Sequence, residues 1–190
     1  ARSASGIALA DLNGDAGTTD IRFYTDNNFA APPRTASVAG ATTALAAADM
    51  RVAVFTFRGI TITDFNSTPA SDLVLPDSSG AVIRDLRFAG NKLLDINDSG
   101  LRVWDLAQQR VIRSFPLAAQ PLALSLHPTA AIATVMHADG VTSVHYEAAG
   151  SQPAQISVTG GNRYPKKIAA SSSKLFLFDG QSVEVFDTAA

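Results

Sequence analysis

A short pattern recurs along this chain at intervals of about 40 residues, and it constrains the fold more than any other feature. Each copy alternates apolar and polar residues, as in ITITD at 60–64 and LRVWD at 101–105. Such alternation favours a half-buried β-strand. The fourth residue of successive copies is Tyr24, Thr63, Trp104, His145 and Phe186.

The residues around each copy indicate three more strands per repeat. A turn rich in Asp and Gly precedes the pattern, for example NDSG at 97–100, and both residue types tolerate the positive φ of tight hairpins. Two apolar runs lie before that turn, and one follows the pattern. In the third repeat, VIRDLRF at 82–88 is the first of the runs before the turn, and RVIRSF at 110–115 is the run after the pattern. About 40 residues with four antiparallel strands are typical of one propeller blade.

The repeats predict an all-β fold, a β-propeller of four-stranded antiparallel blades that forms a single domain or a propeller fragment. We expect five recognisable blades, at approximately 1–40, 41–78, 79–118, 119–160 and 161–190. Residues 6–11 are expected to be the second strand of the first blade, which then lacks its innermost strand. Residues 183–187 are expected to be the third strand of the last blade, without an outermost strand. Because unpaired strand edges invite association, we expect an N-terminal segment before Ala1, or another chain, to complete the ring.

The segment DSGLRVWDL at 98–106 resembles a WD repeat. The resemblance implies that Asp98 lies in the turn between the second and third strands and joins a hydrogen-bonded set with Trp104. Asp139 precedes His145 by the same spacing, but no Gly-His pair precedes any first strand. We therefore expect a divergent WD-like or quinoprotein-like propeller, in which Trp104 and His145 are equivalent and largely buried. Tyr24, Trp104, His145 and Phe186 are the expected structural residues of the third strands.

The strongest candidate for a functional site in the sequence is the segment ADLNGDAGTTD at 10–20. Its alternating oxygen donors suit calcium, which takes six to eight oxygen ligands from a flexible loop. The segment resembles the calcium loops of integrin-type propeller repeats, although Ala16 replaces a glycine of that pattern and the last Asp comes one residue late. The alternative is a hairpin turn rich in Asn, Gly and Asp that needs no ion. The expected ligands are Asp11, Asn13, Asp15 and Asp20.

The turns before the repeated pattern should share one rim of the propeller. They present one charged residue per blade, and we expect this rim to be acidic and to contact a partner. The expected rim residues are Arg58, Asp98, Asp139 and Asp179.

Composition and spacing argue against several other functions. There is no cysteine, the three histidines lack zinc-ligand spacing, and no nucleophile motif accompanies them, so we expect no catalytic residue. A net charge of −2 gives no general attraction to nucleic acid. No apolar run reaches the roughly 20 residues of a membrane-spanning helix, so we expect no membrane insertion.

The sequence therefore favours a non-enzymatic scaffold whose loop rim binds a protein or peptide, with calcium as a stabilising ion. One alternative is a calcium-dependent propeller hydrolase of the lactonase or phosphatase type, which would need several carboxylates and a histidine at the axial channel. Another is a structural module of a larger secreted or surface protein. The many alanines, and a basic set that is mostly arginine, are typical of a GC-rich bacterial source. The compartment stays open between the cytoplasm and the periplasm or cell exterior.

Overall fold

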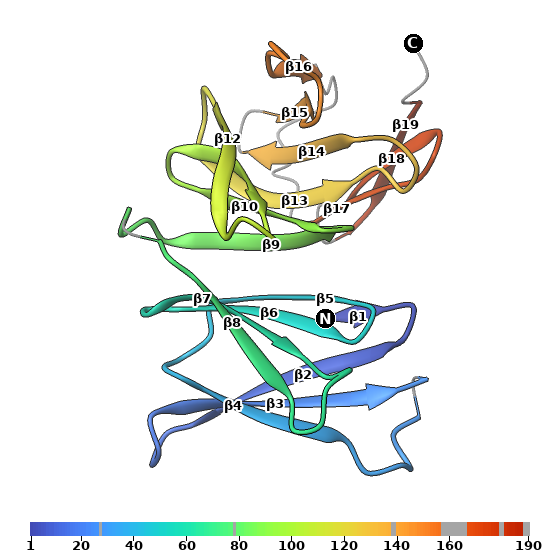
Figure 1. The fold of residues 1–190 in the computed structure, drawn as a ribbon. Helices are drawn as coiled ribbons and strands as arrows, with labels where there is room; N and C mark the ends of the chain where they lie inside the picture. Colours follow the sequence, from blue (N-terminus) through green and yellow to red (C-terminus); the bar gives the residue numbers. More distant parts are fainter. Residues whose placement is uncertain (27, 78, 138–139, 157–166, 179–180, 188–190) are drawn as a thin grey trace.

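The computed structural model describes the chain except for residues 27, 78, 138–139, 157–166, 179–180 and 188–190. The described residues form five antiparallel β-sheets joined by turns (Figure 1). Within this part of the chain, no helix has the length and apolar character needed to cross a membrane.

The strands follow one another in chain order within each sheet. The first sheet contains β1 (Arg2–Ser3), β2 (Gly6–Asn13), β3 (Thr18–Thr25) and β4 (Arg34–Ala39). The second contains β5 (Ala44–Ala48), β6 (Arg51–Thr56), β7 (Gly59–Asp64) and β8 (Ser71–Leu75). The third contains β9 (Ile83–Ala89), β10 (Lys92–Asn97), β11 (Gly100–Asp105) and β12 (Arg110–Pro116). The fourth contains β13 (Pro121–Leu126), β14 (Ile132–His137), β15 (Gly140–His145) and β16 (Ala154–Ile156), and the last contains β17 (Lys167–Ala170), β18 (Lys174–Phe178) and β19 (Val183–Asp187).

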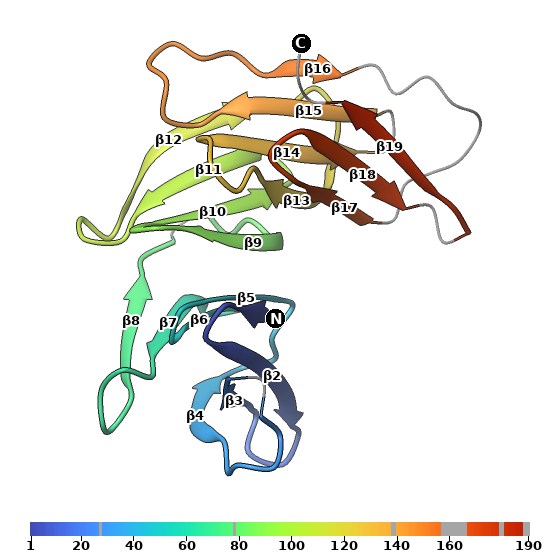
Figure 2. The same ribbon diagram turned by 90° about the vertical axis from the view of Figure 1, so that its right-hand side faces the viewer.

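The sheets are arranged as the blades of a propeller. The first strands of consecutive sheets neighbour one another, in the order β1, β5, β9, β13 and β17. The first and last sheets lie at opposite ends of this array in both views (Figures 1 and 2). The predicted fold class, an all-β propeller with antiparallel blades, is confirmed.

The first sheet corrects one detail of the sequence prediction. Strand β1 pairs with β2 through Arg2↔Ile7 and Ser3↔Gly6, so the innermost strand that was expected to be absent is present. A strand of two residues is too short to show an alternating pattern, which is why the sequence did not reveal it. In the last sheet, β19 pairs with β18, and no described strand pairs with its other edge.

The hydrophobic core is divided into four layers, one between each pair of consecutive sheets. We call the face of a sheet that points to the following sheet its forward face, and the opposite one its backward face. Between the third and fourth sheets, for example, Leu94, Ile96 and Val103 of the forward face pack against Ala133 and Val135 of the backward face. Each fully buried aliphatic side chain contributes about 1.5–3 kcal/mol relative to an exposed one, so these layers hold the sheets together.

Cross-strand pairing shows which residues of the repeat are equivalent. Trp104 lies opposite Leu93, and the corresponding pairs in the other sheets place Tyr24, Thr63, Val144 and Phe186 at the same position. The prediction that His145 matches Trp104 was therefore wrong. His145 lies opposite Ile132 and is exposed, because the third and fourth repeats are 40 residues apart rather than 41. A shift of one residue turns a strand side chain to the other face.

Candidate functional site

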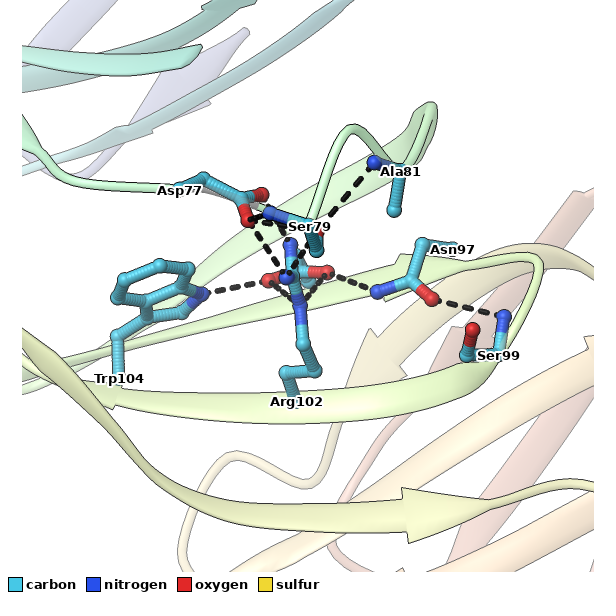
Figure 3. Close-up of polar contacts among 8 residues, drawn as sticks. Asp77, Ser79, Ala81, Asn97, Ser99, Arg102 and Trp104 are labelled. Atoms are coloured by element: carbon cyan, nitrogen blue, oxygen red, sulfur yellow. Dashed lines mark hydrogen bonds and ion pairs between the residues drawn. The ribbon is translucent and has the colours of Figure 1, made fainter.

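A buried polar network lies at the centre of the third sheet (Figure 3). Asp95 on β10 is fully buried and faces Arg102 on β11 as its cross-strand partner. Arg102 Nε lies 3.1 Å from both carboxylate oxygens of Asp95. Trp104 Nε1 donates to Asp95 Oδ2 at 2.5 Å, and Asn97 Nδ2 donates to Oδ1 at 2.9 Å. The carboxylate is thus completely surrounded by donors.

The same guanidinium also holds the connection between β8 and β9. Arg102 Nη2 and Nη1 bind the two carboxylate oxygens of Asp77 at 2.8 and 3.1 Å, and Nη1 donates to Ser79 Oγ at 3.0 Å. The side chains of Arg102 and Asp77 are 11% and 6% exposed. Arg102 thus binds Asp95 in the third sheet and Asp77 in the β8–β9 connection at once, so the network attaches this connection to the third sheet.

The two carboxyls differ in their electrostatics. Burial raises the pKa of Asp95, although Arg102, Trp104 and Asn97 oppose that effect. Burial also acts on Asp77, but hydrogen bonds from Arg102 and Ser79 outweigh it and lower the pKa of Asp77 to about 2. The hydrogen bonds of the Arg102 guanidinium all go to side chains of this network, namely Asp95, Asp77 and Ser79. The arrangement therefore stabilises the blade.

Asp77 should make the stability of the protein depend on acid pH. Its pKa is lower when folded than the ordinary 3.8, so its contribution is complete above pH 3.8 and is lost as the pH falls towards 2. We expect Asp77→Asn to be less stable at neutral pH and to lose less stability over this interval. Urea denaturation of both proteins at several pH values measures this difference in stability. Equal slopes for both proteins would contradict the assignment.

The WD resemblance assigned Asp98 to a network with Trp104, but the aspartate that accepts the Trp104 hydrogen bond is Asp95. Asp98, which the WD resemblance placed with Trp104, lies in the exposed turn and instead accepts bonds from Arg84 Nε and Nη2 at 3.0 and 2.7 Å. Gln120 Nε2 also donates to it, at 3.1 Å. The signal for Asp95 was available, because an acidic residue interrupts the apolar run KLLDI and an arginine stands opposite it in the same hairpin.

The proposed calcium ligands lie in and beside the β2–β3 hairpin. Asp11 and Asp20 are cross-strand partners, but Asp11 pairs with Arg22 at 3.2 Å, and Asp20 accepts bonds from Ser37 and Asn13. Asn13 Oδ1 accepts a bond from Ala16 N at 3.3 Å. Among the described residues, no group of three or more His, Cys, Asp or Glu side chains is arranged to hold a metal ion.

Calcium binding at this hairpin stays a prediction that a melting experiment can test. An ion held by Asp11 and Asp15 would raise the melting temperature by mass action. The comparison is the melting temperature in millimolar calcium and in chelator, for the wild type and for Asp15→Asn. A calcium-dependent rise that the substitution removes would support the site. Identical melting of the wild-type protein under both conditions would contradict it.

The rim that carries these hairpin turns has a hydrophobic groove between the first two sheets. The groove has a volume of about 340 Å³ and lies against the β4–β5 connection. Leu12 on its wall is 63% exposed, and the hydroxyl of Thr42 is buried without a hydrogen-bond partner among the described residues. The lining residues are Ala10, Leu12, Thr19 and the segment 41–45.

Phe57 and Arg58 extend this surface at the β6–β7 turn. Phe57 is 77% exposed, and its ring lies on Gly40, where a Cβ atom would come within 2.7 Å of the ring. The guanidinium of Arg58 stands over the same ring, 5.5 Å from its centre. Hydrogen bonds from Gly40 N to Gly17 O and from Thr43 N to Phe55 O attach the intervening connection to both sheets. We call Leu12, Thr42, Phe57 and Arg58 the rim groove.

The other rim residues named from the sequence do not form one acidic surface in the described part of the chain. Asp98 is engaged by Arg84 and Gln120, and Asp139 and Asp179 lie outside the described residues. Tyr24 and Phe186 are half-buried, and Tyr24 packs against Phe29 with 4.8 Å between ring centres. Exposed apolar residues such as Leu12 and Phe57 were missed, because in the sequence they look like ordinary members of apolar strands.

Comparisons with known proteins support the fold. No protein-family model matches the chain, and no curated protein matches it in sequence. Similar solved structures include a WD40-type propeller chain in the crystal structure of the mitotic checkpoint complex, with a TM-score of 0.62 and 18% identity over 78% of this chain. PorZ, a bacterial surface component of the type-IX secretion system of Porphyromonas gingivalis, aligns over 100% of this chain with a TM-score of 0.72 and 10% identity. Apo AztD from Citrobacter koseri aligns over 95% with a TM-score of 0.66 and 14% identity.

The chain spans only part of each of these proteins. It covers 47% of the checkpoint-complex chain, 26% of PorZ and 56% of AztD. At these identities the likeness establishes a common fold and carries no activity with it, because propellers host many unrelated functions.

Proposed function

We propose that this chain is a non-enzymatic binding module that receives an extended peptide segment of a protein partner in the rim groove. The observation that carries the proposal is the exposure of Leu12 and Phe57, at 63% and 77%, beside the cation of Arg58, which stands over the Phe57 ring. Aromatic residues and arginine are the residue types that most often dominate binding energy at protein interfaces.

The groove is held in place before any partner arrives. Its floor is the β4–β5 connection, which is hydrogen-bonded to the first sheet through Thr42 N to Thr19 Oγ1, at 3.1 Å, and to the second through Thr43 N. Phe57 packs against Gly40, which limits where its ring can lie. A site that is already ordered loses little entropy on binding, which favours affinity.

The chemistry of the groove defines the partner. Leu12 and Phe57 would contact an apolar side chain, and Arg58 would pair with an acidic residue beside it. We therefore infer a peptide in which an apolar residue stands next to Asp or Glu.

The hydrolase alternative lacks comparable support. It requires several carboxylates and a histidine that converge, whereas the described residues contain no such group of three. A role as one module of a larger secreted or surface protein is compatible with the binding proposal, since a fixed rim can present the same groove in either context.

Peptide selection from a random display library against the immobilised chain tests the proposal. We expect selected sequences to share an apolar residue next to an acidic one, and Phe57→Ala to weaken their affinity at least tenfold, the effect of removing about 1.4 kcal/mol. The matched control is Val74→Ala, which truncates a residue of β8 that is 57% exposed and outside the groove. If the selected peptides bind Phe57→Ala and the wild type equally well, the groove is not the binding site.

A further inference from the structure

The tip of the β2–β3 hairpin joins an asparagine directly to a glycine. Asn13 is the last residue of β2, and Gly14 is the first residue of the turn that leads to Thr18 at the start of β3. This is the only Asn-Gly pair in the sequence. Every residue from Asn13 to Gly17 is exposed, so water has free access to the pair.

An asparagine side chain can react with the backbone nitrogen of the residue that follows it. The nitrogen attacks the side-chain carbon Cγ and gives up its proton, ammonia leaves, and a succinimide ring closes. Water then opens the ring at either carbonyl, which leaves an aspartyl or an isoaspartyl residue. The net change is the gain of one water and the loss of one ammonia. Glycine hinders the ring closure least, because it has no Cβ atom next to the attacking nitrogen.

The hydrogen bonds of the Asn13 side chain are long. Its Nδ2 donates to Asp20 Oδ2 at 3.4 Å, and its Oδ1 accepts from Ala16 N at 3.3 Å. The most common N–H···O distance is about 2.9–3.0 Å, so these bonds restrain the side chain weakly. Asn97, by contrast, is buried, and its side chain donates to Asp95 at 2.9 Å and accepts from the backbone at 2.8 Å.

We propose that Asn13 is a site of spontaneous deamidation, and that the reaction loosens the hairpin where it meets the β4–β5 connection. The new carboxylate places a negative charge beside Asp20, where the amide had donated a hydrogen bond. In the isoaspartyl product the main chain runs through the side chain, which adds one methylene to the turn. Gly17 O of this turn accepts the bond from Gly40 N at 2.9 Å. An effect on peptide binding rests on the proposed function, since this connection is the floor of the rim groove.

Incubation of the whole chain at mildly alkaline pH, followed by peptide mapping with mass spectrometry, tests the site. We expect Asn13 to be converted to its aspartyl and isoaspartyl forms at least about tenfold faster than Asn66 and Asn91, since tenfold corresponds to only about 1.4 kcal/mol in the barrier. Both controls are exposed, but Ser67 and Lys92 follow them in place of a glycine. Equal rates at Asn13 and Asn66 would overturn the proposal.

Gly14→Ala is the matched variant. The φ of Gly14 lies outside the left-handed region, and a Cβ atom at this position would meet no atom within 4 Å, so alanine fits the turn. The added methyl group hinders the attack of the backbone nitrogen, and conversion of Asn13 should slow by about tenfold or more. Conversion of Asn13 in Gly14→Ala at the wild-type rate would also overturn the proposal.

Hydrogen exchange of the Gly40 amide measures the effect on the connection. We expect this amide to exchange faster in the deamidated fraction, separated by ion-exchange chromatography, than in the intact fraction. The control is the Tyr146 amide, which donates to Ala131 O in the fourth sheet and should exchange equally in both fractions. Unchanged exchange at Gly40 would overturn the loosening of the hairpin. Neither measurement uses a peptide, so both outcomes are independent of whether the rim groove binds one.

Discussion

Replacing Arg102 with alanine is expected to lower the free energy of unfolding by about 3–5 kcal/mol, because it leaves the carboxylates of Asp95 and Asp77 buried without their cation. The loss exceeds that of a surface ion pair, which contributes about 0–1 kcal/mol. Urea denaturation at neutral pH, followed by circular dichroism, measures the change.

A compensating variant separates charge from packing. If the cost arises from uncompensated carboxylates, then adding Asp77→Asn and Asp95→Asn to Arg102→Ala should restore part of the lost stability, since neutral amides are less costly to bury. The matched control is Arg84→Ala, which breaks the exposed pair with Asp98 and should cost less than about 1 kcal/mol. An Arg102→Ala protein as stable as Arg84→Ala would refute the assigned role.

Truncating Trp104 to alanine should cost about 3–5 kcal/mol, as expected for a large aromatic side chain in a core. Trp104 is 2% exposed, belongs to the layer between the second and third sheets, and donates to Asp95. Trp104→Phe keeps most of the packing but removes the indole donor, so its cost should be smaller, about 1–3 kcal/mol. Thermal and urea denaturation of both variants would measure these contributions.

His145→Ala is the natural control for this series, because the two residues share the repeated sequence pattern but lie on opposite faces of their strands. His145 is exposed, so its truncation should change stability by no more than about 0.5 kcal/mol. A loss at His145 as large as that at Trp104 would contradict the register derived from the cross-strand pairs.

The sequence predicted the sheets because hairpin turns and alternation are local signals. Four strands per repeat, the order of the blades and the place of residues 6–11 all follow from patterns a few residues long. The repeat spacing is not constant, however, and a step of 41 residues from Trp104 predicts His145 where the structure places Val144, 40 residues on. Side-chain direction in a strand changes with every residue, so it cannot be derived from an approximate period.

The buried network around Arg102 and the exposure of Phe57 could not be predicted from local sequence patterns. Asp95 and Asp77 are 18 residues apart in the chain, and only the fold brings both to Arg102. The exposure of Phe57 depends on the neighbouring connection at Gly40, which belongs to another sheet. The resemblance to a WD repeat found the right hairpin but the wrong aspartate, because the family's polar set is replaced here by an arginine between two carboxylates.

The division of the core into four separate layers has a consequence for how this protein can change over time. Each layer is formed only by the two sheets that enclose it, so the energy of the array is close to a sum of nearest-neighbour terms. A unit duplicated or deleted at an end of such an array alters a single layer and leaves the others as they were. Gene duplication can therefore lengthen or shorten such an array by one sheet at a time. The residues of each remaining layer stay under separate selection.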